Sequence, residues 1–142
     1  MAFWLMKSEP DVYSFEDLKK DGDKGVEWHG IRNYLARNNM RLMKIGDKIL
    51  YYHSNIGLEV VGIAEVCALS HPDSTSPDDP RWDCVDIRAV MDFPRKVTRN
   101  ECKANPLLDK MYLVVSTRLS VQPVTESEWE EVCRMAGLVP AP

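Results

Sequence analysis

The chain has 142 residues, of which 44% are hydrophobic and 28% are charged, and its formal net charge is −4. This length and composition are typical of one globular domain with a single core, spanning residues 1–142. The negative charge argues against tight, non-specific binding of a duplex, which depends on neutralising many phosphates. No apolar run approaches the roughly 18 residues of a membrane span, and no secretory signal is recognisable, so we expect an intracellular, cytoplasmic protein.

The first third of the chain predicts one strand and two helices. Ala2–Lys7 has the short, apolar, aromatic character of a buried strand, and Ser14 with Asp17 predicts a cap for a helix over Phe15–Lys20. A second helix is expected to open directly after Gly30. The residues expected on its buried face are Ile31, Leu35 and Leu42.

The middle of the chain predicts three strands. They are expected at Lys48–His53, Leu58–Leu69 and Trp82–Phe93, with a Pro/Asp/Ser-rich loop over His71–Arg81. Gly62 interrupts the second of these strands, which indicates either a bulge or a close approach of another part of the chain.

The C-terminal third predicts two helices. Pro94–Pro106 is expected to form a short strand and then a helix capped by Thr98, and Leu113–Val115 a brief strand or turn. Thr125 with Glu128 predicts a capping box for a last helix over Glu126–Met135. Strands in the middle with helices near both ends favour an α+β domain built on a curved or barrel-like sheet.

Constellations typical of catalysis or metal binding are sparse in this sequence. His53 and Ser54 are adjacent, so on a strand they point to opposite faces and cannot form a nucleophile–base pair. The four cysteines show no C-x-x-C pair, and the three histidines are scattered. There is no phosphate-binding glycine motif. We therefore expect a protein without enzymatic activity, metal or cofactor.

Residues suited to binding a flat ligand are, by contrast, plentiful. They gather in three segments, Phe3–Pro10, Trp28–Arg41 and Tyr51–Asn55, each of which combines aromatic rings with amide, hydroxyl or charged groups. Rings can stack on a base, amides can read its edge, and guanidinium groups can hold phosphates. Trp28 is the strongest candidate for the stacking ring, because it is expected in a loop ahead of a helix N-terminus.

Six motifs in the chain closely resemble the EVE domain family. They are WLMKSEP at 4–10, WHGIRNYLARN at 28–38, YHSN at 52–55, GIA at 62–64, DPRWDCVD at 79–86 and RLSVQPV at 118–124. The resemblance implies a PUA-like mixed β-barrel of about five to six strands with flanking helices, related to YTH and ASCH domains. It also implies a pocket that holds a flipped, modified nucleobase such as 5-methylcytosine or a derivative. The stand-alone bacterial members are the more similar ones; a eukaryotic protein of this kind would be expected in the nucleus.

This interpretation predicts a non-enzymatic module whose partner is a nucleic acid or a modified nucleoside or nucleotide. The predicted base-binding residues are Trp4, Lys7, Ser8, Trp28, Asn33, Tyr34, Tyr52, His53, Ser54, Asn55 and Trp82. The predicted phosphate-binding residues are Arg32, Arg37, Arg41 and Arg118.

Two other functions remain open at this point. An aromatic cage for methylated lysine would use cation–π contacts, with Glu9 as the nearby acid, although the arginines of the second segment would repel a cation. A small RNA-processing hydrolase of the ASCH type would use Lys7, Arg37 and His53.

Overall fold

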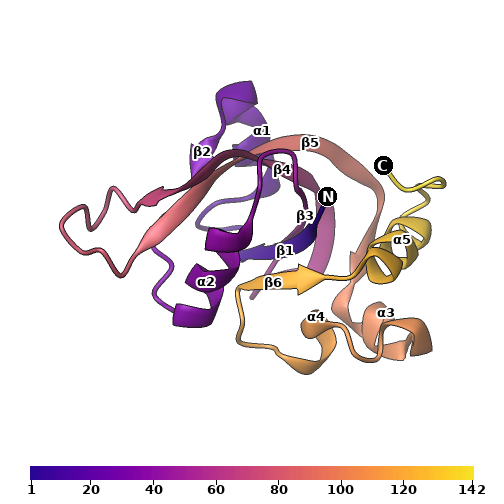
Figure 1. Ribbon diagram of the computed structural model, residues 1–142. Helices are drawn as coiled ribbons and strands as arrows, with labels where there is room; N and C mark the ends of the chain where they lie inside the picture. The colour runs from indigo at the N-terminus through magenta and orange to yellow at the C-terminus, as the bar shows by residue number, and fades with distance from the viewer.

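A six-stranded mixed sheet organises the fold (Figure 1). The computed structural model describes residues 1–142. The strands lie in the order β2-β5-β4-β3-β1-β6, and β1–β3 is the parallel pair among antiparallel ones. Their bounds are β1 Phe3–Ser8, β2 Val26–Glu27, β3 Lys48–His53, β4 Glu59–Pro72, β5 Asp83–Thr98 and β6 Val121–Val124. The α+β class and the six strands are confirmed.

Five α-helices flank the sheet (Figure 1). Their bounds are α1 Phe15–Asp21, α2 Tyr34–Leu42, α3 Arg99–Ala104, α4 Tyr112–Val115 and α5 Glu126–Met135. The capping boxes predicted for α1, α3 and α5 are present, with both reciprocal hydrogen bonds made. The segment at 113–115, expected as a strand or turn, belongs to the one-turn helix α4. No helix of the protein is both long enough and apolar enough to cross a bilayer.

The central strands separate two hydrophobic clusters, because successive side chains of a strand point to opposite faces. Met6 and Tyr51 face the cluster covered by α1 and α2. Leu5 and Tyr52 face the other cluster, which includes Trp129 of α5. The chain thus buries apolar side chains on both faces of β1 and β3, which makes these strands the rigid centre of the molecule.

The sheet is not closed into the expected barrel, because its edge strands β2 and β6 do not pair with each other. Helix α2 packs against both β5 and β6. The buried Asn39 side chain donates a hydrogen bond to the Val121 carbonyl of β6 (2.8 Å), and Arg41 forms an ion pair with Asp83 of β5 (2.6 Å). Helix α2 thus lies between β5 and β6, where a closed barrel would need strand-to-strand hydrogen bonds.

Helix α2 differs from its prediction in both its start and its buried face. It begins at Tyr34, four residues after Gly30, and its buried residues are Ala36, Asn39 and Met40. Leu35 and Leu42, expected in the core, are 54% and 67% exposed. The helix thus turns toward the sheet the face that carries Ala36 and Met40, both of which are fully buried.

The strands β4 and β5 form a long hairpin whose tip projects from the body of the molecule (Figure 1). The strand β4 continues past the expected Leu69 to Pro72, and β5 continues past the expected Phe93 to Thr98, so that the loop between them spans residues 73–82. The close approach predicted at Gly62 is confirmed: a Cβ atom there would lie 2.4 Å from the Phe15 ring. The register also shifts beside Gly62, and such shifts help a long hairpin to bend.

Candidate functional site

Two adjoining hollows open where the parallel strands β1 and β3 end. One, of about 410 Å³, is lined by Lys7, Ser8, Glu9, Val12, Trp28, His29, Ile31, Ser54, Thr117, Arg118 and Ser120. The other, of about 550 Å³, is lined by Ser8, Val12, Tyr13, Asp21, Lys24, Gly25, Val26, Glu27, Trp28, His29 and Ser74. Because they share Ser8, Val12, Trp28 and His29, we treat them as one depression and call it the Trp28 cleft.

Backbone pairing brings three segments together at the mouth of this cleft. The register of β1 and β3 places Ser8 opposite His53, and the Ser54 N–H donates to the Ser8 carbonyl (2.9 Å). The Lys7 N–H donates to the Ser120 carbonyl (2.9 Å), which joins the segment ahead of β6. The ends of β1 and β3 and the 116–120 segment therefore form one continuous rim.

Trp28 forms a wall of the cleft and is also part of the core. It follows β2, and its N–H donates to the Val85 carbonyl (2.8 Å). Its ring makes edge-to-face contacts with Tyr13 and Tyr51, at centroid separations of 6.2 and 5.7 Å. Only 7% of the residue is exposed, so most of the ring packs against protein and a small part remains for a ligand.

Lys7 and Ser8 use part of their hydrogen-bonding capacity to shape the cleft. The Lys7 ammonium group donates to the Thr117 carbonyl (2.8 Å), and burial, together with the neighbouring Arg99, lowers the pKa of Lys7. The Ser8 hydroxyl donates to the Tyr13 carbonyl (2.7 Å). The ammonium group has two further N–H bonds that can reach a ligand.

Four other side chains on the rim have no hydrogen-bond or ion-pair partner in the protein: Glu9, His29, Ser54 and Arg118. They supply a carboxylate, an imidazole, a hydroxyl and a guanidinium group from four separate segments. Glu9 and His29 are not among the residues predicted for the pocket. Glu9 directly follows Ser8 and His29 directly follows Trp28, so their positions next to predicted residues could have indicated them.

The predicted arginines of the second segment lie outside the cleft and have partners in the protein. The Arg32 guanidinium donates to the Asp73 carboxylate (2.9 Å), and the Arg37 guanidinium donates to the Arg81 carbonyl (2.9 Å). Arg41 is paired with Asp83. These side chains fasten α2 and the segment before it to the β4–β5 hairpin, whereas Arg118 lines the cleft with its guanidinium group unengaged.

Tyr34 and Trp82 also lie outside the cleft, where α2 meets the hairpin, and Tyr34 is exposed whereas Trp82 is buried. Their rings are stacked at 5.1 Å with an interplanar angle of 26°. The Arg37 guanidinium lies 4.8 Å from the Tyr34 ring centroid, and that of Arg32 lies 5.3 Å from the Trp82 centroid. Asn33 is exposed and caps α2, with its side-chain oxygen accepting from the Ala36 N–H (2.9 Å).

His53 points away from the cleft residues toward the start of α1. Its Nε2 atom accepts a hydrogen bond from the Phe15 N–H (3.1 Å), which requires an unprotonated nitrogen. Burial, reinforced by the positive charge of Lys96, lowers the pKa of His53. The imidazole thus anchors a helix.

The remaining predicted residues are also structural in this fold. The Trp4 indole N–H donates to the buried Asp47 carboxylate (3.0 Å). Tyr52 lies in the cluster beneath α5, on the face of the sheet opposite Trp28. Asn55 adopts a positive φ of 69° in the turn after β3 and does not line either hollow.

Asp73 stabilises one side of the site by hydrogen bonds, and none of the six motifs contains it. Its buried carboxylate accepts hydrogen bonds from the Gly30 N–H (2.8 Å), from Arg32, and from the Thr75 N–H (2.8 Å). Burial by itself would raise the pKa of Asp73, but these hydrogen bonds hold it well below its usual range. The Asp-Ser-Thr sequence, which is typical of an Asx turn, was the available local signal.

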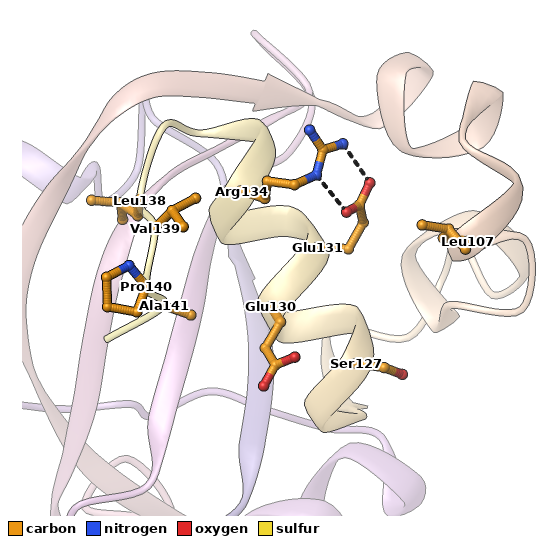
Figure 2. A pocket seen from close by; sticks show the side chains of 9 residues that line it. All are labelled: Leu107, Ser127, Glu130, Glu131, Arg134, Leu138, Val139, Pro140 and Ala141. Atoms are coloured by element: carbon orange, nitrogen blue, oxygen red, sulfur yellow. Dashed lines mark hydrogen bonds and ion pairs between the residues drawn. The ribbon is translucent and has the colours of Figure 1, made fainter.

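A further hollow, of about 590 Å³, lies between α5 and the C-terminal segment (Figure 2). None of the residues predicted for binding lines it. The one guanidinium group that lines it belongs to Arg134 and is paired with the Glu131 carboxylate at 2.7 Å, as the dashed lines in Figure 2 show. It therefore offers fewer free polar groups than the Trp28 cleft does.

Comparisons with known proteins find similarity along nearly the whole chain. The family model of the EVE domain matches residues 2–135. Human thymocyte nuclear protein 1 is 31% identical over 171 residues, covering 99% of this chain and 76% of that protein. A crystal structure of human THYN1 in complex with DNA containing 5-methylcytosine superposes with a TM-score of 0.89 at 32% identity, covering 99% of this chain and 100% of the other.

Two further structures bear on the fold. The crystal structure of protein Atu2648 from Agrobacterium tumefaciens has a TM-score of 0.98 at 64% identity, covering 100% of this chain and 97% of that one. A YTH domain of Zygosaccharomyces rouxii MRB1 has a TM-score of 0.56 at 20% identity, covering 95% of this chain and 86% of that one, which is a likeness of fold alone.

Proposed function

The chain belongs to the EVE domain family, and from that premise we propose that it is a non-enzymatic domain that binds nucleic acid and reads a modified base. The base, a modified cytosine such as 5-methylcytosine, occupies the Trp28 cleft after turning out of its strand. The human relative solved with DNA containing 5-methylcytosine supports this ligand class.

The observation that carries the proposal is the convergence of unpaired polar groups beside Trp28. A carboxylate such as that of Glu9 accepts a hydrogen bond from the exocyclic amino group of cytosine, and the Ser54 hydroxyl can donate or accept. The Arg118 guanidinium suits the phosphate next to the extruded nucleotide. The three side chains come from separate segments, so a single base can be contacted from several directions.

The energetics favour single-stranded ligands with modest selectivity for the methyl group. Burying one methyl group contributes about 0.8 kcal/mol, which corresponds to roughly fourfold in affinity. Turning a base out of a duplex costs a few kcal/mol, a cost that a single strand largely avoids.

The test is a fluorescence anisotropy titration with labelled single strands that carry either one 5-methylcytosine or one cytosine. We expect roughly fourfold tighter binding of the methylated strand. Glu9→Gln replaces a charged acceptor by a weaker neutral one, and Ser54→Ala removes a hydroxyl group, so each is expected to weaken binding about tenfold. Glu130→Gln, at the hollow beside α5, is the matched control and should bind like the unmodified protein. Equal binding by all variants would exclude the Trp28 cleft as the reading site.

The two other candidate functions find less support in the geometry. Lys7 lines the cleft, whereas Arg37 lies on the surface of α2 and His53 anchors α1, so the three groups of a hydrolase are not assembled. The Arg118 guanidinium disfavours a methylated lysine in the cleft. Incubation with oligonucleotides and nucleosides, followed by mass spectrometry, is expected to yield no product; turnover would instead identify an enzyme.

A further inference from the structure

Three side chains with metal-binding atoms meet on neighbouring strands near the loop end of the β4–β5 hairpin. They are Glu27 of β2, His71 of β4 and Cys84 of β5, and their ligand atoms all lie within 4.8 Å of one another. The strand register creates this meeting, since His71 lies directly opposite Cys84 and β2 pairs alongside β5. The cluster thus depends on the strand register, which shifts between Ala68 and His71 of β4.

The orientation of His71 matches that of a metal-ligating histidine. Its Nδ1 atom lies 4.0 Å from the Cys84 sulfur, while its Nε2 atom lies 2.8 Å from the Asp86 carboxylate. Metal-bound histidines typically present one ring nitrogen to the ion and donate the other N–H to a carboxylate, which fixes the ring. Asp86 is therefore placed as a positioning residue.

We propose that Glu27, His71 and Cys84 bind one zinc ion, with a water molecule as the fourth ligand. Thiolate, imidazole and carboxylate are all ligands of Zn²⁺, and three protein ligands with one solvent position form a known type of zinc site. A thiolate disfavours Mg²⁺ and Ca²⁺, which prefer oxygen ligands. Tetrahedral coordination at the usual bond lengths separates ligand atoms by about 3.5 Å, so small side-chain movements complete the site.

Binding releases protons, and these have a clear origin. In the metal-free protein the buried Cys84 thiol lies against Glu27, and its proton leaves for solvent when the sulfur takes the ion. The His71 Nδ1 atom, which lies 3.2 Å from the Pro72 carbonyl, must also be without a proton to donate its lone pair. No bond other than these is broken, and no redox partner is needed.

The ion would tie β2 to the hairpin. Since Glu27 itself lines the cleft and is followed directly by Trp28 and His29, the zinc site would stabilise one wall of the cleft. The inference does not depend on the proposed base reading, because metal binding is measured without nucleic acid.

The test is a titration of metal-stripped, reduced protein with Co²⁺, followed by Zn²⁺. We expect saturation at one Co²⁺ per chain, with the thiolate-to-cobalt charge-transfer absorption and the visible bands of a tetrahedral site. Zn²⁺ should then remove both signals, and it should raise the Tm of the unmodified protein. Absence of saturable Co²⁺ binding, or saturation without a thiolate band, would overturn the proposal.

Variants locate the site. Cys84→Ser is expected to abolish the charge-transfer band, whereas Cys133→Ser, which alters an equally buried thiol in the opposite core, should retain it. Asp86→Asn should weaken Co²⁺ binding by about 10- to 100-fold while leaving the shape of the spectrum unchanged.

Glu27→Gln, at a half-buried residue, should weaken Co²⁺ binding while the circular dichroism spectrum stays unchanged. A charge-transfer band that persists in Cys84→Ser, or Co²⁺ affinity unchanged in Glu27→Gln, would place the metal elsewhere and overturn the assignment.

Discussion

The imidazole of His53 accepts a hydrogen bond from the Phe15 N–H at the first turn of α1. In the sequence His53 is a candidate for the pocket and for a hydrolase, since it stands beside Ser54 at a strand end. The strand β3 ends at His53, whose ring packs on Tyr51 and reaches the helix, whereas Ser54 lies in the turn that follows and lines the cleft. Two neighbouring residues thus take unrelated roles because the strand ends between them.

The same bond makes the stability of the protein depend on pH. Burial and Lys96 lower the pKa of His53 below its ordinary value of 6.5. The unfolded chain therefore takes up this proton at a higher pH than the folded chain does. The stability that comes from neutral His53 is complete above pH 6.5 and is lost as the pH falls through the folded-state pKa.

We expect the free energy of unfolding to decrease between about pH 7 and about pH 5 with a steeper slope in the unmodified protein than in His53→Gln. Urea denaturation followed by circular dichroism at several pH values measures both slopes. His29 and His71 are present in both proteins, so their contributions cancel in the comparison. Parallel slopes would show that His53 has the same pKa in the folded and unfolded chains.

At the scale of elements, the junction between α2 and the β4–β5 hairpin carries most of the charged residues that the sequence suggested for binding. The Asp73 carboxylate accepts hydrogen bonds from Gly30 and Arg32. In the same way, Arg37 donates to the Arg81 carbonyl and Arg41 to the Asp83 carboxylate, both on the hairpin. An arginine that makes such contacts must break them before it can bind a phosphate. The junction therefore positions the segment between Trp28 and α2, which borders the cleft.

Asp73→Asn should destabilise the protein by about 1–3 kcal/mol, because the neutral amide leaves hydrogen-bond donors at a buried position poorly paired. Urea denaturation with a metal chelator present measures this change without any contribution from bound metal. Asp78→Asn, at an exposed residue of the same hairpin tip without a hydrogen-bond partner, is the matched control. If both variants lose equal stability, the Asp73 hydrogen bonds do not hold the junction.

At the scale of the whole molecule, the net charge of −4 and the engagement of its arginines limit how a nucleic acid can be bound. Among the four arginines predicted to contact phosphates, Arg118 is the one that lines the cleft without a protein partner. Lys7 adds a second cation nearby. Under the proposed base-reading function, these two cations would make one or two phosphate contacts beside the base.

The affinity for a single strand should accordingly fall with salt at a log–log slope of about −0.7 to −1.4, since each phosphate contact contributes about −0.7. Arg118→Ala should make the slope shallower by about 0.7. Arg37→Ala removes an arginine bound to the hairpin and should leave the slope unchanged. Anisotropy titrations at four or more salt concentrations measure these slopes. A slope equivalent to six or more contacts would contradict the picture of a small cleft.

Local sequence determined most of the secondary structure. The boxes Ser14–Asp17, Thr98–Glu101 and Thr125–Glu128 place the starts of three helices, because a cap and its partner lie three residues apart. The strand β3 also has its predicted bounds. The six motifs indicated the family, whose model matches residues 2–135, and the order of the expected strands and helices indicated the α+β class.

Tertiary structure alone decided which of these residues face the cleft. Trp28 is part of the core because Tyr13 and Tyr51 pack against it, and the buried face of α2 follows from the space between β5 and β6. The contacts of Asp73 with Gly30 and Arg32, and of Glu27 with His71 and Cys84, join positions more than forty residues apart. Such contacts depend on strand order and register, which no short stretch of sequence contains.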